Sequence, residues 1–246
     1  MKNNYYQQPV ANIYAKPTQK SEITSQILYG EEFKILNKGK NWLKIKTVYD
    51  NYVGFLKNHK LSNIRFKPSY KVYKLKTKIF KKAQNKFFSF KKFLYFGTKI
   101  SVLNSDTKFL EFKKNQWIKK SDLKPINFYE KNFLKVLKFF LNTKYLWGGK
   151  TSSGIDCSAL VQIYFFFNNI YFPRDTADQI KFLRKVKNHK LYNKYNLLYW
   201  KGHVAISLNK NLLIHAYGPK KKVVIMRKNK TIKEIKKNTN LNLKKI

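Results

Sequence analysis

The residue of this 246-residue chain best suited to nucleophilic chemistry is its single cysteine, Cys157. The apolar residues Leu160, Val161, Tyr164 and Phe165 follow it at helical spacing and predict a buried helix that begins at the cysteine. The first turn of a helix lowers the pKa of a thiol, because its unpaired N–H groups and positive dipole end favour the thiolate. A lone cysteine is more often an inert core residue. Its position at a helix start, after Gly-Ile-Asp and before Ser, favours a nucleophile instead.

A thiol nucleophile needs a base, and two of the four histidines are placed to supply one. His203 and His215 fall in alternating segments, 203–208 and 212–217, which predict two antiparallel strands. If residues 209–211 form the turn, position 205 faces His215 and His203 lies on the same face. One imidazole can then face the sulfur as part of a thiolate–imidazolium pair while the other orients it. Each histidine taken alone would more often be structural.

The remaining two histidines are not expected to take part. His59 and His189 lie in stretches rich in Lys and Asn, and we expect them on the surface. One cysteine also excludes an internal disulfide and any metal site built from several cysteines of one chain. If this cysteine has a function, we expect it to act as a thiol.

Several phrases around these residues resemble a known family. They are Tyr145-Leu-Trp-Gly-Gly149, Ser153-Gly-Ile-Asp-Cys-Ser-Ala-Leu-Val-Gln162, Phe172-Pro-Arg-Asp175 with Gln179, Gly202-His-Val-Ala-Ile-Ser-Leu208 and Leu213-Ile-His-Ala216. In this order, over roughly residues 126–226, they are similar to the NlpC/P60 cysteine peptidases. The resemblance implies a papain-like α+β domain. Two features depart from the family pattern: Ala159 replaces the usual Gly, and Tyr195-Asn196 replaces the usual Gly-Asp. An inactive copy therefore stays an alternative.

The resemblance also implies roles for individual residues. Cys157 is the nucleophile, His203 the general base and acid, and His215 the orienting third member. Tyr145, with the backbone N–H of Cys157, serves the oxyanion, although a core Tyr is an equal alternative. The expected substrate-binding residues are Asp156, Ser158, Asp175, Trp147, Glu31 and Tyr52. Asp156 could instead be only a helix N-cap.

The elements ahead of this site contain a weak internal repeat. Gly30 has a counterpart in Gly97 and Ile45 in Phe112, at a constant offset of 67. Each copy consists of short alternating stretches separated by Gly- or Asn-rich breaks, which predict half-buried strands. The phrases of the first copy resemble bacterial SH3 domains, and the second copy is a looser match. A helical stripe over 128–141 then begins an α+β segment. We predict SH3-like domains at 1–66 and 67–125, and the peptidase domain at 126–246.

The chain carries 53 Lys and Arg against 12 Asp and Glu, a net charge of +41. Only four are Arg, and the lysines are spread evenly rather than gathered into a basic block. This distribution favours a compositional bias over a specific nucleic-acid site; attraction to an anionic polymer remains an alternative. The run 163–167 is too short to span a membrane and predicts a buried helix face, and 231–235 could begin a last helix. We expect a cytoplasmic monomer with no membrane partner.

The resemblance implies a reaction. The expected substrate is a murein tri- or tetrapeptide with a free N-terminal L-Ala, used in peptidoglycan recycling. It is cleaved between γ-D-glutamate and meso-diaminopimelate or Lys through a thioester, without a metal or an organic cofactor. In such relatives the first SH3-like domain roofs the cleft and binds the substrate's amino terminus, for which Glu31 and Tyr52 are the candidates. Two alternatives are a non-catalytic SH3-like module held on an anionic polymer, and an acyltransferase or amidase of the same superfamily.

Overall fold

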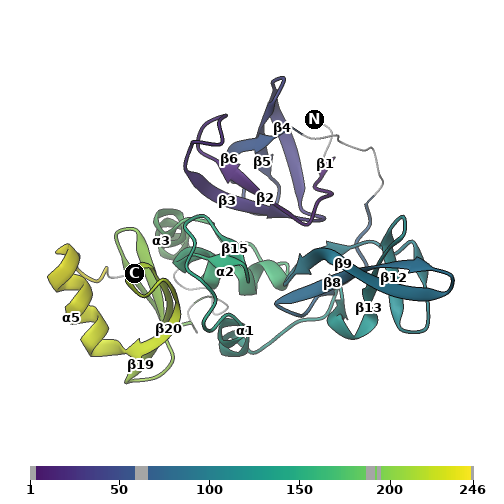
Figure 1. The fold of residues 1–246 in the computed structure, drawn as a ribbon. Coiled ribbons are helices and arrows are strands. Elements are labelled where there is room, and N and C mark those ends of the chain that lie inside the picture. The colour runs from purple at the N-terminus through teal and green to yellow at the C-terminus, as the bar shows by residue number, and fades with distance from the viewer. Residues whose placement is uncertain (1–3, 59–65, 187–191, 193–194, 245–246) are drawn as a thin grey trace. The chain divides into compact units, whose positions relative to one another are not determined.

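The computed structural model describes residues 4–58, 66–186, 192 and 195–244 (Figure 1). Contacts divide the chain into two units, Met1–Glu130 and Lys131–Ile246, each of which we describe by itself. His59 and His189 lie outside the described residues. The boundaries 1–66, 67–125 and 126–246 stay predictions. No helix of the described part of the chain is long and apolar enough to cross a membrane.

The first β-domain, residues 4–58, is a six-stranded antiparallel sheet with the strand order β1-β4-β5-β6-β2-β3. Alternate residues point inward and form its core, including Ile13, Phe33, Leu43 and Ile45. This confirms the alternation seen in the sequence. The strands are β1 (Asn4–Tyr5), β2 (Val10–Tyr14), β3 (Ile23–Leu28), β4 (Glu32–Lys38), β5 (Trp42–Thr47) and β6 (Val53–Lys57).

The second β-domain, residues 70–125, contains a three-stranded sheet, β10-β7-β14, and a five-stranded sheet, β11-β12-β13-β8-β9. Its core includes Val72, Leu94 and Ile118, and Tyr29 of the first β-domain packs into it. The elements are β7 (Tyr70–Val72), β8 (Lys76–Ala83), β9 (Lys86–Tyr95), β10 (Lys99–Ile100), β11 (Asn104–Ser105), β12 (Phe109–Lys113), β13 (Gln116–Lys119), η1 (Lys120–Asp122) and β14 (Leu123–Pro125).

The predicted repeat is visible as the same turn in both β-domains. Gly30 and Gly97, 67 residues apart, both have a positive φ, of 76° and 81°. The next side chain then accepts the backbone N–H three residues before it: Leu28 donates to Glu31 Oε1 at 2.8 Å, and Tyr95 donates to Thr98 Oγ1 at 3.3 Å. The offset of 67 therefore marks equivalent structure.

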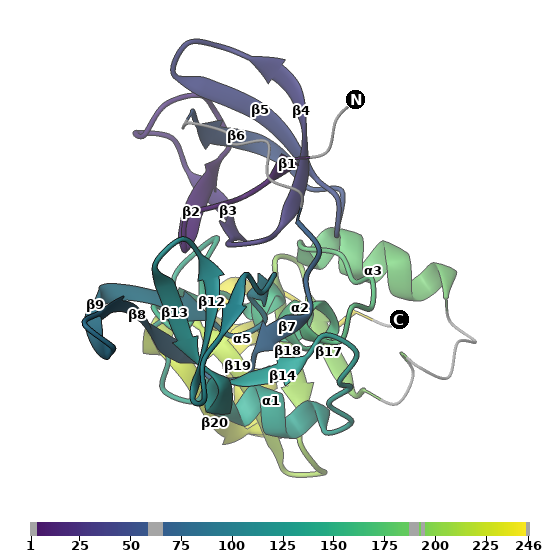
Figure 2. The same ribbon diagram turned by 90° about the vertical axis from the view of Figure 1, so that its right-hand side faces the viewer.

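The second unit is built around a four-stranded antiparallel sheet, β17-β18-β19-β20. Helix α2 lies against β18 and β19, and α5 lies against β20 (Figures 1 and 2). Helix α2 is buried throughout, which confirms the buried helix predicted for 163–167. The elements are α1 (Phe133–Phe139), β15 (Lys150–Thr151), β16 (Gly154–Ile155), α2 (Cys157–Phe167), α3 (Thr176–Lys185), β17 (Leu197–Trp200), β18 (His203–Ser207), β19 (Leu212–Tyr217), η2 (Gly218–Lys220), β20 (Lys222–Arg227) and α5 (Lys228–Thr239).

The first helix is shorter than the stripe over 128–141 predicts. Helix α1 covers only Phe133–Phe139. Asn132 begins it, because its side chain accepts the backbone N–H of Lys135 at 2.9 Å. At the other end Asn142 has a φ of 63°, which ends the helical path.

Candidate functional site

The single cysteine is the first residue of helix α2. The N-cap is Asp156, whose Oδ1 accepts the backbone N–H of Ala159 at 2.8 Å. The cap explains why the helix begins here, since it satisfies one of the N–H groups that a helix start leaves without an intrahelical acceptor. Cys157 is buried, with 3% of its surface exposed. The predicted helix start is therefore confirmed.

The carboxylate of Asp156 accepts five hydrogen bonds from the chain itself. Oδ1 also accepts from Ser158 Oγ and Arg174 Nη1, both at 3.0 Å. Oδ2 accepts from the backbone N–H of Gly148 at 3.0 Å and from Arg174 Nη2 at 2.6 Å. These bonds favour the N-cap interpretation. A role for Asp156 in binding substrate stays a prediction.

Arg174 is a residue to which sequence reasoning gave no role. Its side chain is 1% exposed and pairs through both terminal nitrogens with Asp156. Gln179, also fully buried, donates to the carbonyls of Ser158 at 3.1 Å and Pro173 at 2.9 Å and accepts from Tyr199 Oη at 2.9 Å. A signal was available in the phrase Pro-Arg-Asp, because an Arg is rare in this Lys-rich chain. Together these residues tie α2, α3 and β17 around the start of α2.

The two histidines of the predicted hairpin meet. The pairing of Ile206 with Ile214 confirms the register derived from the turn at 209–211. His203 Nε2 lies 3.0 Å from His215 Nδ1. His215 is fully buried, and its ring stacks on Tyr217 at 4.4 Å between centroids. Its other nitrogen, Nε2, lies 3.2 Å from Met226 Sδ on β20. The contact of His215 with Met226 was not predicted from the sequence.

The sulfur of Cys157 lies beside the strand that begins with His203. The backbone N–H groups of Val204, the residue after His203, and of Ser158 both bond the sulfur and lower its pKa. Burial acts in the opposite direction and is the largest effect, and the Asp156 charge adds to it. The pKa of Cys157 is raised to about 12. The expectation that the helix start yields a lowered pKa is therefore wrong for this state, because burial and the adjacent carboxylate outweigh the N–H groups.

Both imidazoles prefer the neutral form as well. Burial lowers the pKa of His203 to about 4. Burial, with a smaller effect from His203, lowers the pKa of His215 to about 3. These shifts favour a neutral thiol at Cys157 and neutral imidazoles at His203 and His215 over a thiolate–imidazolium pair. Such a site can act by general-base catalysis, in which the thiol loses its proton as it attacks.

The remaining predicted residues of this unit are distributed around the start of α2. Burial raises the pKa of Tyr145, and the charges of Cys157 and Asp156 raise it further. The hydroxyl of Tyr145 is therefore close enough to both groups to interact with them electrostatically. Ser158 is buried and donates to Asp156. Asp175 is half-buried at the N-cap of α3 and makes no side-chain cap bond there, while Trp147 is 51% exposed. The binding roles of these residues stay predictions.

Comparisons with known proteins agree with this geometry. Residues 142–239 match the NlpC/P60 family, and residues 13–61 match the bacterial dipeptidyl-peptidase SH3 domain. The chain carries an NlpC/P60 cysteine peptidase domain. It is preceded by a bacterial SH3 domain, and the mixed α and β fold predicted from the sequence is confirmed.

Three relatives illustrate the match. Dipeptidyl-peptidase 6 of Lysinibacillus sphaericus is 25% identical over 230 residues, 84% of each chain. The gamma-D-glutamyl-L-lysine dipeptidyl-peptidase of Bacillus subtilis is 33% identical over 69 residues, 27% of this chain and 23% of that protein. The crystal structure of an NlpC/P60 family protein from Bacillus cereus superposes with a TM-score of 0.74 at 18% identity, covering 93% of this chain and 95% of that one. The last shows a shared fold.

The two candidates in the SH3 domain have defined local surroundings. Glu31 is buried, and its Oε1 supports the turn by accepting the N–H of Leu28. Tyr52 donates its hydroxyl to the carbonyl of Thr24 at 3.3 Å. Both side chains therefore form hydrogen bonds within their own domain. Their contact with substrate stays a prediction.

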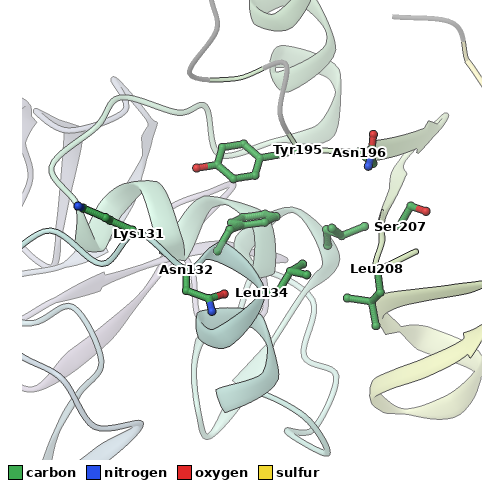
Figure 3. A pocket seen from close by; sticks show the side chains of 9 residues that line it. Lys131, Asn132, Leu134, Tyr195, Asn196, Ser207 and Leu208 are labelled. Carbon is green, nitrogen blue, oxygen red and sulfur yellow. The ribbon is translucent and has the colours of Figure 1, made fainter. Parts of the chain in front are cut away.

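A separate cavity of about 470 Å³ opens in the second unit between the start of α1 and the far end of β18 (Figure 3). Its lining includes Lys131, Asn132, Tyr195, Asn196 and Ser207. None of the predicted site residues lines it. Among the described residues no group of three or more His, Cys, Asp or Glu could hold a metal ion.

Proposed function

We propose that this chain hydrolyses short cell-wall peptides at the amide between γ-D-glutamate and a diamino acid, meso-diaminopimelate or Lys, in peptides with a free N-terminal L-Ala. The observation that carries the proposal is the meeting of a capped cysteine, at the start of α2, with the strand that begins at His203 and carries the His203–His215 contact. The Bacillus subtilis relative, a gamma-D-glutamyl-L-lysine dipeptidyl-peptidase, supports the choice of this bond. We also propose that this chain acts as a monomer in cytoplasmic peptidoglycan recycling.

The reaction follows from the placement of the groups. His203 uses Nε2 to contact His215, so its remaining ring nitrogen, Nδ1, serves the thiol. Nδ1 takes the proton from Cys157 Sγ as the sulfur attacks the carbonyl carbon, and a C–S bond forms. The backbone N–H of Cys157 and the hydroxyl of Tyr145 stabilise the oxyanion. The C–N bond then breaks, the imidazolium protonates the leaving amine, and water hydrolyses the thioester with His203 as the base.

Mass spectrometry of L-Ala-γ-D-Glu-diaminopimelate and its Lys counterpart, before and after incubation, tests this proposal. We expect L-Ala-γ-D-Glu and the free diamino acid from the native chain. The Cys157→Ala variant should lose the activity by at least about a thousandfold, because no other residue can form the thioester. A Cys157→Ala protein that still cleaved would overturn the mechanism.

Two further outcomes would contradict the proposed function. Intact peptide with the native chain, together with retention on an anionic polymer, would favour a non-catalytic binding module. Transfer of the acyl group to an added amine, in place of hydrolysis, would favour an acyltransferase.

A further inference from the structure

The second buried histidine has a sulfur as a neighbour. His215 Nδ1 faces His203 Nε2 at 3.0 Å, and His215 Nε2 faces Met226 Sδ at 3.2 Å. The three side chains come from three successive strands, β18, β19 and β20. On the paired strands β19 and β20, Leu213 is opposite Met226 and His215 is opposite Val224, so Met226 is the diagonal neighbour of His215 on the same face. The register thus fixes the sulfur next to the ring.

The thioether sulfur of Met226 determines which ring nitrogen of His215 carries the proton. A thioether has no hydrogen and can only accept, weakly. A lone pair on His215 Nε2 would therefore face a second electron-rich atom, whereas an N–H there donates to Sδ. His215 is neutral in this environment, because burial lowers its pKa to about 3. A neutral imidazole carries one N–H, so with the proton on Nε2 its Nδ1 holds the lone pair.

The position of the proton on His215 then determines the position of the proton on His203. Its Nε2 must carry the proton that His215 Nδ1 accepts at 3.0 Å. Because His203 is also neutral, its Nδ1 keeps the lone pair. This is the nitrogen that the proposed mechanism needs free to remove the proton of the Cys157 thiol. In the opposite tautomer Nδ1 would carry a proton and could not act as the base.

We propose that Met226 is a positioning residue, whose sulfur sets the tautomer of His215 and thereby leaves the lone pair of His203 on Nδ1. Met226 contacts His215, and it acts on the reaction through that ring. For its effect on turnover the inference rests on the proposed function. The tautomer itself can be measured without any substrate.

The test uses the two methionines of the chain, Met1 and Met226. Growth on norleucine replaces both and removes the sulfur while keeping the unbranched shape, and Met226→Leu gives a second, genetically encoded variant. Ile225→Leu, on the adjacent position of β20, is the matched control. The imidazole ¹⁵N chemical shifts of His203 and His215 report which nitrogen carries each proton.

In the native chain and in Ile225→Leu we expect a single tautomer, with both rings protonated at Nε2. In the norleucine protein and in Met226→Leu we expect a mixture of tautomers at both rings. We also expect kcat to fall about three- to tenfold with KM nearly unchanged, as loss of one weak hydrogen bond to the positioning histidine predicts. Unchanged ¹⁵N shifts in both sulfur-free proteins would overturn the inference. If the native chain cleaves no peptide, the proposed function fails while the ¹⁵N result still decides the role of Met226.

Discussion

At the scale of single residues, the buried ion pair of Arg174 with Asp156 supports the residue that directly precedes the nucleophile. Arg174 donates from both terminal nitrogens, and Asp156 also caps α2 and accepts from the turn at Gly148. Both charges are buried, and a buried pair is worthwhile only when its geometry and remaining hydrogen bonds are satisfied. The five bonds to Asp156 meet that condition. The position of Cys157, the next residue, therefore depends on Arg174.

Replacing this arginine should be costly. Arg174→Met leaves the carboxylate of Asp156 buried without its partner, and we expect the free energy of unfolding in urea to fall by about 3–5 kcal/mol. Adding Asp156→Asn removes the charge and keeps an N-cap side chain, so the double variant should recover part of this loss. Arg184→Met, at an exposed position of α3, is the control and should change stability by less than about 0.5 kcal/mol. Equal stability of the two single variants would contradict the role given to Arg174.

The pH profile of the reaction should reflect the burial of His203. The active form of a general base is the unprotonated one, so activity falls as pH drops through its pKa. An ordinary imidazole with a pKa of about 6.5 is roughly 90% protonated at pH 5.5. Burial lowers the pKa of His203 to about 4, so it is still almost entirely neutral there. We expect kcat/KM to stay nearly constant from pH 7.5 down to about pH 5.5 and to fall below it.

The substrate's own ionisation is the control for this profile. The diaminopimelate and Lys peptides share an α-amine and α-carboxyl groups, so titration of the free peptides is needed to show which part of an acid limb belongs to the substrate. An acid limb centred at pH 6.5 or above with both substrates would show that His203 titrates like an exposed imidazole.

At the scale of elements, the sequence predicted those parts that local rules control. A single assumption about the turn at 209–211 gave the register that brings His203 to His215, because pairing on a hairpin is set by its turn. The offset of 67 residues predicted equivalent turns at Gly30 and Gly97. Both predictions needed only neighbours in the chain or a repeat of the same pattern.

Other parts depend on residues distant in the chain. The ion pair of Asp156 with Arg174 spans 18 residues, and neither an Asp nor an Arg in a sequence predicts by itself that it has a buried partner. The raised pKa of Cys157 also depends on how deeply the sulfur is buried, which a position at a helix start does not reveal. The contact of His215 with Met226 requires the pairing of β19 with β20, which no sequence pattern predicted.

The turn that leads into α2 has no room for a side chain at Gly149. A Cβ placed there would lie 2.5 Å from the carbonyl oxygen of Gly154 and 2.9 Å from that of Leu146, and backbone atoms cannot rotate away. Gly149 itself accepts the backbone N–H of Asp156 at 3.2 Å. We expect Gly149→Ala to lower the free energy of unfolding by about 1–3 kcal/mol and to lower kcat/KM about tenfold or more, because Asp156 and Cys157 must shift with the turn.

Gly39→Ala is the matched control for the turn. Its added Cβ meets only the carbonyl oxygen of Trp42, at 3.2 Å, in the first β-domain. We expect a small change in stability and none in kcat/KM. Full activity of Gly149→Ala would contradict the tight turn described above.

At the scale of the whole molecule, each of the two units has apolar clusters of its own. The first unit contains the cores of its two β-domains, and Tyr29 of the first packs into the core of the second. The second unit has the buried helix α2 and a further cluster in which Ile235 of α5 packs with Trp200 and Leu213. A part of a chain with its own core can fold by itself. The proposed division of labour is that the second unit performs the chemistry while Glu31 and Tyr52 of the first recognise the substrate's amino terminus.

Separating the units tests this division. We expect residues 131–246 alone to fold, shown by a cooperative thermal transition and by the blue-shifted fluorescence of the fully buried Trp200. We expect this unit to cleave N-acetylated and free peptides with similar kcat/KM, whereas the intact chain should prefer the free amine by about tenfold or more, the value of one charge-assisted hydrogen bond. Glu31→Gln in the intact chain removes the charge and keeps the acceptor for Leu28, so it should lower the preference without unfolding the turn. If residues 131–246 fold and keep the full preference, recognition of the amino terminus belongs to the catalytic unit itself, and Glu31 serves only its turn.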